Sequence, residues 1–266
     1  MLRNVYDAQL RAHVPERMPD GVRTERSGPI TRTAGLGHRG FVEYRDLGDL
    51  TRDELDTLIA EQVAWFAALG EPFEWKLHGH DRPAFLAERL RAAGFVAEEL
   101  ETVMVAEIAS LDLHVEPPDG VVLREVATRA EFERIAAMET RVWGLDESWH
   151  ADSLEQEKTA DPDGLRIFVA EAGGTVVSAG WLRLPSGTEF GTLWGGSTLA
   201  AWRGRGIYRA LVARRGRLAV EQGRRYLEVD ASDDSRRILE RLGFVPVATT
   251  QPFVWSLGVA NDASEE

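Results

Sequence analysis

The chain contains no cysteine, which excludes disulfide bonds, thiolate metal ligands and a cysteine nucleophile. No apolar run approaches the roughly 18 residues that a membrane-spanning helix needs. The N-terminus lacks the apolar core and the small-residue cleavage site of a signal peptide. Net positive charge is also missing, and a formal charge of −13 argues against general nucleic-acid binding. We therefore expect a cytoplasmic protein with neither a membrane nor a nucleic acid as partner.

The charge that is present is unevenly distributed along the 266 residues. Between Arg203 and Arg225 there are eight arginines but only one acidic residue, Glu221. Such a local excess of positive charge in an acidic chain predicts a place where an anion is held. We expect Arg214, Arg215 and Arg217 to be an exception and to form a solvated helix face.

The strongest domain boundary lies at His114–Gly120, where paired prolines and an Asp-Gly step interrupt regular structure. Hydrophobic periodicity and turn residues after it predict the order β-α-β-β-β-α-β-α-β, a mixed α/β (α+β) sheet domain. Thr128, with Glu131 three residues later, is a capping-box signal for its first helix. The predicted organisation is an N-terminal lobe over 1–114, a linker over 115–120, a domain over 121–258 and a disordered acidic tail over 259–266.

The N-terminal lobe contains a partial repeat of the second domain. Gly70 and Asp81 are separated by eleven residues, as are Gly223 and Asp234, and each segment then continues through an apolar helix pattern to a Gly-Phe step. These steps are Gly94-Phe95 and Gly243-Phe244. The repeat predicts two related lobes, of which the first is incomplete and structural. Strand-helix-strand units that look alike by chance are the alternative.

A glycine-spaced arginine motif, Arg203-Gly-Arg-Gly-Ile-Tyr-Arg209, leads into an amphipathic helix. A helix N-terminus offers unpaired N–H groups and the positive end of the helix dipole, so it attracts phosphate. Glycines let the ligand approach the backbone, and arginines donate charge-assisted hydrogen bonds. The motif is neither a dinucleotide fingerprint nor a Walker loop, because it has neither the third glycine nor a Gly-Lys-Ser/Thr sequence. A basic turn without a ligand remains the alternative.

The order strand, glycine loop, helix, strand, and then a helix ending in Leu-Gly-Phe resembles the GNAT (Gcn5-related N-acetyltransferase) superfamily. The resemblance covers about residues 121–258, and "ILERLGF" matches that family's "LYEKLGF" segment. It implies a GNAT-like acyl-CoA N-acyltransferase fold with two lobes, acetyl-CoA as cosubstrate and no metal. By the same resemblance the pantetheine arm lies between two central strands.

The resemblance also implies which residues hold the cosubstrate. The backbone of the loop and first helical turn would bind the pyrophosphate, with Arg203 and Arg205 beside it. The upstream strand would hold the pantetheine arm and polarise the thioester carbonyl. These cofactor-binding residues are Gly196, Ser197, Thr198, Arg203, Gly204, Arg205, Gly206, Ile207, Tyr208 and Arg209.

Two residues are candidates for the base that deprotonates an attacking amine. Glu228 matches the position where some family members carry a catalytic glutamate, and Glu189 at the head of the preceding strand is the second candidate. A salt bridge is the alternative role for Glu228, and an exposed strand end is the alternative for Glu189. Two departures from the family pattern stand out: Tyr208 occupies a small-residue position, and Leu239 replaces the tyrosine that often protonates the leaving thiolate.

The acceptor is expected to be a small-molecule amine, with cationic character possible because the segment Gly144–Glu157 is acidic. The protein is expected to be a monomer or a homodimer. His78 and His80 imply no third ligand, so no metal site is predicted. Two other functions stay open: a non-catalytic acyl-CoA-binding sensor, suggested by Leu239, and a nucleic-acid module that uses the arginine-rich helix.

Overall fold

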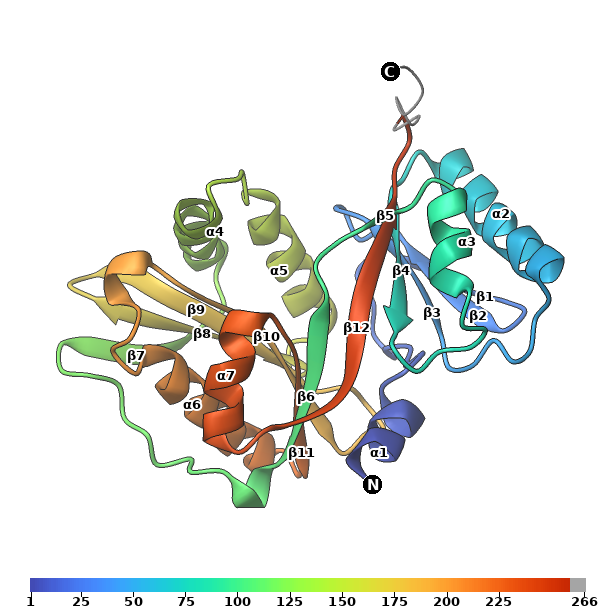
Figure 1. Ribbon diagram of the computed structural model, residues 1–266. Helices are drawn as coiled ribbons and strands as arrows, with labels where there is room; N and C mark the ends of the chain where they lie inside the picture. The colour runs from blue at the N-terminus through green and yellow to red at the C-terminus, as the bar shows by residue number, and fades with distance from the viewer. Residues whose placement is uncertain (259–266) are drawn as a thin grey trace, which may run out of the picture.

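One mixed β-sheet of 12 strands runs through both halves of the protein, whose computed structural model describes residues 1–258 (Figure 1). The mixed α/β class predicted from periodicity is therefore confirmed. The predicted tail, 259–266, lies outside the described residues. The strand order is β1-β2-β3-β4-β12-β6-β11-β10-β9-β8-β7, with β5 paired to β12.

The C-terminal half contains every strand and helix that the sequence predicted, and one more helix, α5. Its hydrophobic pattern is weak because only Ala151 and Leu154 of α5 are buried, so periodicity alone did not reveal it. The elements are β7 Val121–Val126, α4 Arg129–Trp143, α5 Trp149–Ala160, β8 Leu165–Ala172, β9 Thr175–Arg183, β10 Phe190–Thr198, α6 Ile207–Glu221, β11 Tyr226–Ala231, α7 Asp233–Leu242 and β12 Val245–Trp255. A short 3₁₀ helix, Ala200–Trp202, precedes the glycine loop.

The N-terminal half repeats the middle and end of this order. Its elements are α1 Leu2–Gln9, β1 Arg23–Ser27, β2 Ile30–Ala34, β3 Gly40–Tyr44, α2 Arg52–Leu69, β4 Phe73–His78, α3 Leu86–Ala92, β5 Val96–Ala97, β6 Glu101–Glu107 and the 3₁₀ helix Ile108–Ser110. Strands β3 and β4 pair in parallel, as β10 and β11 do. The half has no counterpart of α4 and α5 among its described elements.

Both Gly-Phe steps of the repeat end a helix in the same way. Gly94 and Gly243 adopt φ values of 88° and 105°, which favour glycine. The next amide reaches back into the helix in each case, from Phe95 to the Leu90 carbonyl at 3.1 Å and from Phe244 to the Leu239 carbonyl at 3.0 Å. These bonds satisfy carbonyls that would otherwise lack partners, and both phenylalanines are buried.

The two lobes exchange strands. Strand β6 comes from the N-terminal half but lies between β11 and β12, pairing antiparallel with both. Strand β12 changes partner at Thr250: its first part pairs with β6 and its second part pairs with β4. The predicted division of the chain at 115–120 stays a prediction, and strands from both sides of this segment pair with each other. Hydrophobic patterns identify strands but do not identify their partners, so this pairing could not be foreseen.

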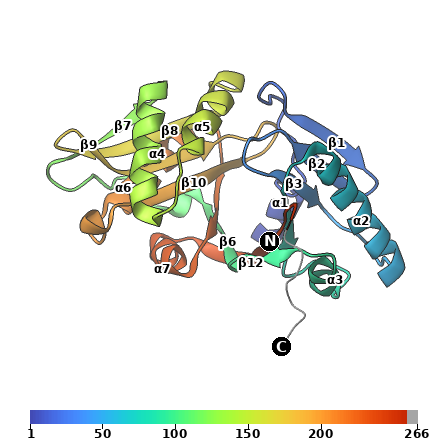
Figure 2. The same ribbon diagram turned by 90° about the horizontal axis from the view of Figure 1, so that it is seen from above.

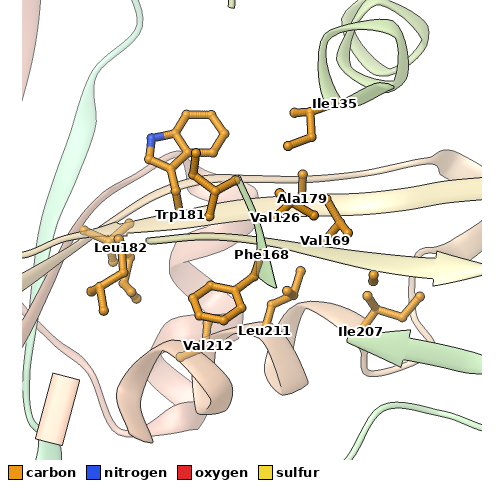
Figure 3. Packing of buried hydrophobic residues seen from close by; sticks show 14 of the residues in the cluster. Val126, Ile135, Phe168, Val169, Ala179, Trp181, Leu182, Ile207, Leu211 and Val212 are labelled. Atoms are coloured by element: carbon orange, nitrogen blue, oxygen red, sulfur yellow. The ribbon is translucent and has the colours of Figure 1, made fainter. Parts of the chain in front are cut away.

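The sheet of the C-terminal half is covered by helices on both faces. Figure 3 shows Trp181 on one side, toward Ile135 of α4, and Phe168 on the other, beside Leu211 and Val212 of α6. We call the side of α4 and α5 the acceptor face. Figure 2 shows these two helices over one lobe, α2 over the other, and α1 between them.

None of the helices within residues 1–258 combines the length and the apolar composition that crossing a membrane requires.

Strand exchange predicts that the two lobes unfold together. Phe253 belongs to β12 but is fully buried in the core of the N-terminal lobe. Phe253→Ala should lower the free energy of unfolding by about 3–5 kcal/mol, in one transition common to both lobes. Urea denaturation followed by tryptophan fluorescence and far-ultraviolet circular dichroism measures this.

Val245→Ala is the control, because Val245 lies on the same strand but is 44% exposed. It should change the free energy of unfolding by less than about 1 kcal/mol. Two separate transitions, of which Phe253→Ala shifts only one, would contradict the shared unfolding.

Candidate active site

Strands β10 and β11 begin as a parallel pair and then part. Their register runs from Phe190↔Tyr226 to Thr192↔Glu228 and stops there, although β10 continues to Thr198 and β11 to Ala231. Backbone groups of both strands beyond Thr192 and Glu228 are therefore not paired with each other. Unpaired strand edges of this kind can bind an extended ligand by main-chain hydrogen bonds.

A β-bulge deforms β10 just beyond this point. The pairing of β10 with β9 shifts between Gly195 and Thr198, and Gly195 and Gly196 adopt φ values of 70° and 90°. These values are strained for residues with a side chain, so both glycines are needed for the bulge. The hydroxyl of Ser178 donates to the Ser197 carbonyl at 2.7 Å and fixes the bulge from β9.

The glycine loop leaves the N-terminus of α6 open. Gly204 and Gly206 adopt φ values of 73° and 85°, no side chain caps the helix, and its first turn contains no acidic residue. The corresponding helix of the other lobe, α2, is closed, because Thr51 and Glu54 form a capping box. The free N–H groups and positive dipole end of α6 therefore remain available for a ligand's anion.

The side chains of the loop face in different directions. Arg203 and Arg205 are exposed, with Arg203 Nε donating to the Thr198 carbonyl at 3.0 Å and the Arg205 guanidinium over the Trp202 ring at 4.7 Å. Ile207 is buried and anchors the helix in the core, whereas Arg209 is exposed. The structure therefore brings Gly196–Thr198 and Arg203–Arg209 together around the end of β10.

Tyr208, the residue that departs from the family pattern, folds back onto the bulge. A Cβ atom at Gly196 would lie 2.8 Å from Cε2 of the Tyr208 ring. The ring therefore occupies the space that the missing side chain of Gly196 leaves. Its packing explains how a tyrosine fits where a small residue was expected, and the exposed backbone of the loop stays accessible.

Arg215 does not belong to a solvated helix face, contrary to the sequence prediction. It is 1% exposed, and its Nη1 donates to the carbonyls of Trp181 and Trp194 at 3.2 and 3.0 Å. Burial lowers its pKa to about 10. Arg214 and Arg217 are also partly buried, and Arg217 donates to the Leu113 carbonyl. The amphipathic pattern did not reveal this because a buried arginine needs carbonyl partners from distant strands.

A buried polar cluster lies beside the bulge on the acceptor face. Ser197 Oγ donates to Glu139 Oε1 at 2.9 Å, and Glu139 Oε2 lies 2.5 Å from His150 Nδ1. Glu139 comes from α4 and His150 from α5, two helices that pack on each other. Glu139 and His150 were not predicted as site residues, since neither stands in a recognisable motif.

Glu228 lies where β10 and β11 part. It is 6% exposed and alternates with Leu227 and Val229, so its side chain points to the acceptor face. Burial raises its pKa well above the usual value, Asp230 raises it further, and Lys76 opposes both. Lys76 forms its ion pair with Asp230 rather than with Glu228. The predicted alternative, a salt bridge of Glu228 to an arginine, is therefore not found among residues 1–258.

Glu189, the second candidate base, lies away from the glycine loop and the bulge. It precedes β10 at the end opposite the bulge, roughly 25 Å from Ser197 along the strand. Its carboxylate is exposed and accepts a hydrogen bond from Gln9 at 2.9 Å. The structure therefore does not bring Glu189 together with the loop. Leu239, at the position of the usual acid, is fully buried in the apolar core.

Strand exchange extends the acceptor face with acidic residues from the other lobe. Glu74 on β4 and Glu101 on β6 lie near Asp230, and Glu43 on β3 lies near Glu74 and Lys76. Burial raises the pKa values of Glu43 and Glu101 to about 7. Five carboxyl groups of the described residues therefore surround Lys76: Glu43, Glu74, Glu101, Glu228 and Asp230.

The parted parallel strands, the bulge and the open helix N-terminus together define a protein with an acyl-CoA acyltransferase fold. The model of the acetyltransferase (GNAT) family matches residues 129–244. Residues 129–244 therefore form a domain of the GNAT family. No curated protein sequence gives a significant match to the chain.

Solved structures agree with this assignment of the fold. A GCN5-related N-acetyltransferase from Kribbella flavida is 19% identical, with a TM-score of 0.64 over 88% of this chain and 89% of that one. A tandem GNAT protein of the clavulanic acid biosynthesis pathway is 14% identical, with a TM-score of 0.64 over 91% and 86%. A conserved protein of unknown function from Staphylococcus epidermidis is 14% identical, with a TM-score of 0.68 over 96% and 98%.

The open helix N-terminus predicts that Gly206 matters for ligand binding more than for folding. Gly206→Ala should raise the dissociation constant of acetyl-CoA about tenfold, because an added Cβ strains the left-handed backbone and obstructs the approach of the pyrophosphate. Isothermal titration calorimetry measures the constant.

Gly223→Ala is the matched control, because Gly223 follows the other end of α6 with a φ of 71° and open space around it. Gly223→Ala should lower the free energy of unfolding as Gly206→Ala does, but it should leave the affinity for acetyl-CoA unchanged. Equal affinities for both variants would show that the loop does not hold the cosubstrate.

The raised pKa values of Glu43 and Glu101 predict a stability that falls as pH rises. Between an ordinary value of 4.5 and the folded value of about 7, the unfolded chain loses protons that the folded chain keeps. The double variant Glu43→Gln, Glu101→Gln lacks this penalty. The difference in melting temperature between the double variant and the parent should therefore be larger at about pH 8 than at about pH 5. Calorimetry at both pH values measures this difference, and an equal difference at both would contradict the prediction.

Proposed function

We propose that the protein transfers an acetyl group from acetyl-CoA to a primary amine, most simply on a small molecule. The observation that carries this proposal is the open N-terminus of α6 beside the parted strands β10 and β11. Loop amides of Gly204 and Gly206 would bind the pyrophosphate, and backbone groups of Gly196–Thr198 would bind the pantetheine arm. The family supports acyl transfer in general, and the acceptor is our inference.

The acidic residues on the acceptor face favour a cationic amine. Within residues 1–258, Lys76 is the one lysine among the carboxyl groups of Glu43, Glu74, Glu101, Glu228 and Asp230, and Arg39 pairs with Glu74 from the edge. Burying so many carboxyl groups is unfavourable unless cations compensate them. A bound ammonium group would provide such compensation and would arrive beside the thioester.

Glu228 is the group that we propose takes a proton from this ammonium. An alkylammonium with a pKa of about 10 is protonated at neutral pH, so a base must act before nitrogen can attack the thioester carbon. The C–N bond then forms, the C–S bond breaks, and sulfur leaves with the electron pair. Arg215 supports the reaction indirectly, because its bonds to the Trp181 and Trp194 carbonyls hold the strand at the bulge.

A non-catalytic acyl-CoA sensor is the second candidate, and one observation favours it. Leu239 is fully buried in the apolar core and cannot protonate a leaving thiolate. A sensor would bind acetyl-CoA as the enzyme does but would not release CoA in the presence of any amine.

A CoA-release assay with methylamine, spermidine, kanamycin and a peptide with a free N-terminus separates the two candidates. The wild-type protein should release CoA with at least one of them. Glu228→Gln should lower kcat about 100-fold or more without changing the affinity for acetyl-CoA, because the amide cannot accept the proton.

Glu189→Gln is the matched control, since it neutralises an exposed carboxylate at the far end of β10. It should retain the parental kcat. Acetyl-CoA binding without CoA release would favour the sensor, and a Glu228→Gln variant with parental rates across the pH range would rule out Glu228 as the base.

A further inference from the structure

The helices α4 and α5 carry a carboxylate–imidazole pair that the mechanism above does not use. Glu139 Oε1 accepts a hydrogen bond from Ser197 Oγ at 2.9 Å, and Glu139 Oε2 lies 2.5 Å from Nδ1 of His150. The Glu139 side chain is 2% exposed, whereas 20% of His150 remains exposed. The pair therefore connects the bulge of β10 to an imidazole that solvent and ligands can reach.

The geometry determines which imidazole nitrogen is available. A carboxylate only accepts hydrogen bonds, so Nδ1 of the neutral ring carries the proton and Nε2 carries the lone pair. Nε2 has no hydrogen-bond partner within residues 1–258. The ring is held between Trp149, with centroids 3.8 Å apart, and Trp181, with centroids 5.8 Å apart. His150 is thus an oriented proton acceptor on the acceptor face.

Further charged and titratable groups lie around the ring. Glu139 makes no ion pair with lysine or arginine in the described part of the chain, and its carboxylate contacts Ser197 and His150 instead. Glu147, in the segment before α5, has its Oε2 atom 3.8 Å from His150 Nδ1. His38, from the other lobe, stacks on Trp149 with the ring centroids 4.3 Å apart. It is another titratable group on the same side of the sheet as His150.

We propose that His150 is a second proton acceptor in the transfer reaction and that Glu139 is the residue that positions it. This inference rests on the proposed function. A primary ammonium must lose two protons in becoming an amide, one before nitrogen attacks and one as the tetrahedral intermediate collapses. Glu228 takes the first and Nε2 of His150 takes the second.

The balance of the reaction is complete with these two groups and acetyl-CoA. Nitrogen forms the C–N bond, the C–S bond breaks, and the sulfur leaves with its electron pair. The sulfur then takes up one of the two protons, and the other passes to solvent. Ser197 Oγ connects the pair to the bulge, whose backbone faces the thioester in the proposed complex.

Variants of the full chain test the role of His150 with whichever panel amine gives the highest rate. His150→Ala should lower kcat at least about 100-fold with unchanged affinity for acetyl-CoA. Added imidazole should restore part of the rate, and the restored rate should increase with pH as imidazole loses its proton. A merely structural role would not produce this dependence.

Glu139→Gln tests the orientation of the ring. A glutamine amide can donate to Nδ1 and so force the ring proton onto Nε2, where it blocks the lone pair. This variant should lose kcat by a similar factor while its acetyl-CoA affinity and melting temperature stay near those of the parent. His38→Ala is the matched control: it removes a neighbouring imidazole that stacks on Trp149 but has no carboxylate partner of this kind, and it should retain most of the activity without any effect of imidazole.

The outcomes distinguish the inference from the proposed function. Wild-type protein that binds acetyl-CoA but acetylates none of the amines overturns the proposed function and the inference with it. Wild-type activity combined with a parental kcat of His150→Ala, or with a loss that imidazole does not restore, overturns only the role of His150. Full activity of Glu139→Gln would overturn the positioning role of Glu139.

Discussion

The insertion of β6 between β11 and β12 is the interaction on which the rest of the structure depends. It supplies the C-terminal lobe with a strand from the first half of the chain, and β12 in turn completes the sheet of the N-terminal lobe. Backbone hydrogen bonds therefore run without interruption across both lobes. Since unpaired strand edges are unfavourable when buried, neither lobe has a complete sheet without the other.

The same exchange of strands brings the charged groups of the acceptor face together. Glu101 arrives on β6 beside Asp230, and Lys76 arrives through the pairing of β4 with β12. A lobe whose corresponding helix, α2, is capped thus still contributes charged groups to the acceptor face. This gives the incomplete N-terminal lobe a direct part in the proposed recognition of a cationic amine, in addition to its structural part.

The two related lobes differ most clearly at one helix end. Helix α2 satisfies its own N-terminus with the Thr51–Glu54 capping box, whereas α6 begins after Gly206 with no cap. A capped terminus has fewer free donors to offer, and the acidic cap would repel a phosphate. Two buried charged side chains hold the bulge of β10, since Arg215 donates to the Trp194 carbonyl and Glu139 accepts from Ser197 Oγ.

The family resemblance pointed to Glu228. Local signals in the sequence determined the elements of the C-terminal half other than α5, the repeat and the glycine loop. These depend on residue type and spacing over a few turns or strands, such as the Thr128 cap and the Gly243 stop. Only the tertiary structure decided the strand exchange, the burial of Arg215, the distance of Glu189 from the loop and the meeting of Glu139, His150 and Ser197. Each of these depends on segments far apart in the chain, and the pairing of such segments is set by packing and register, which no local pattern encodes.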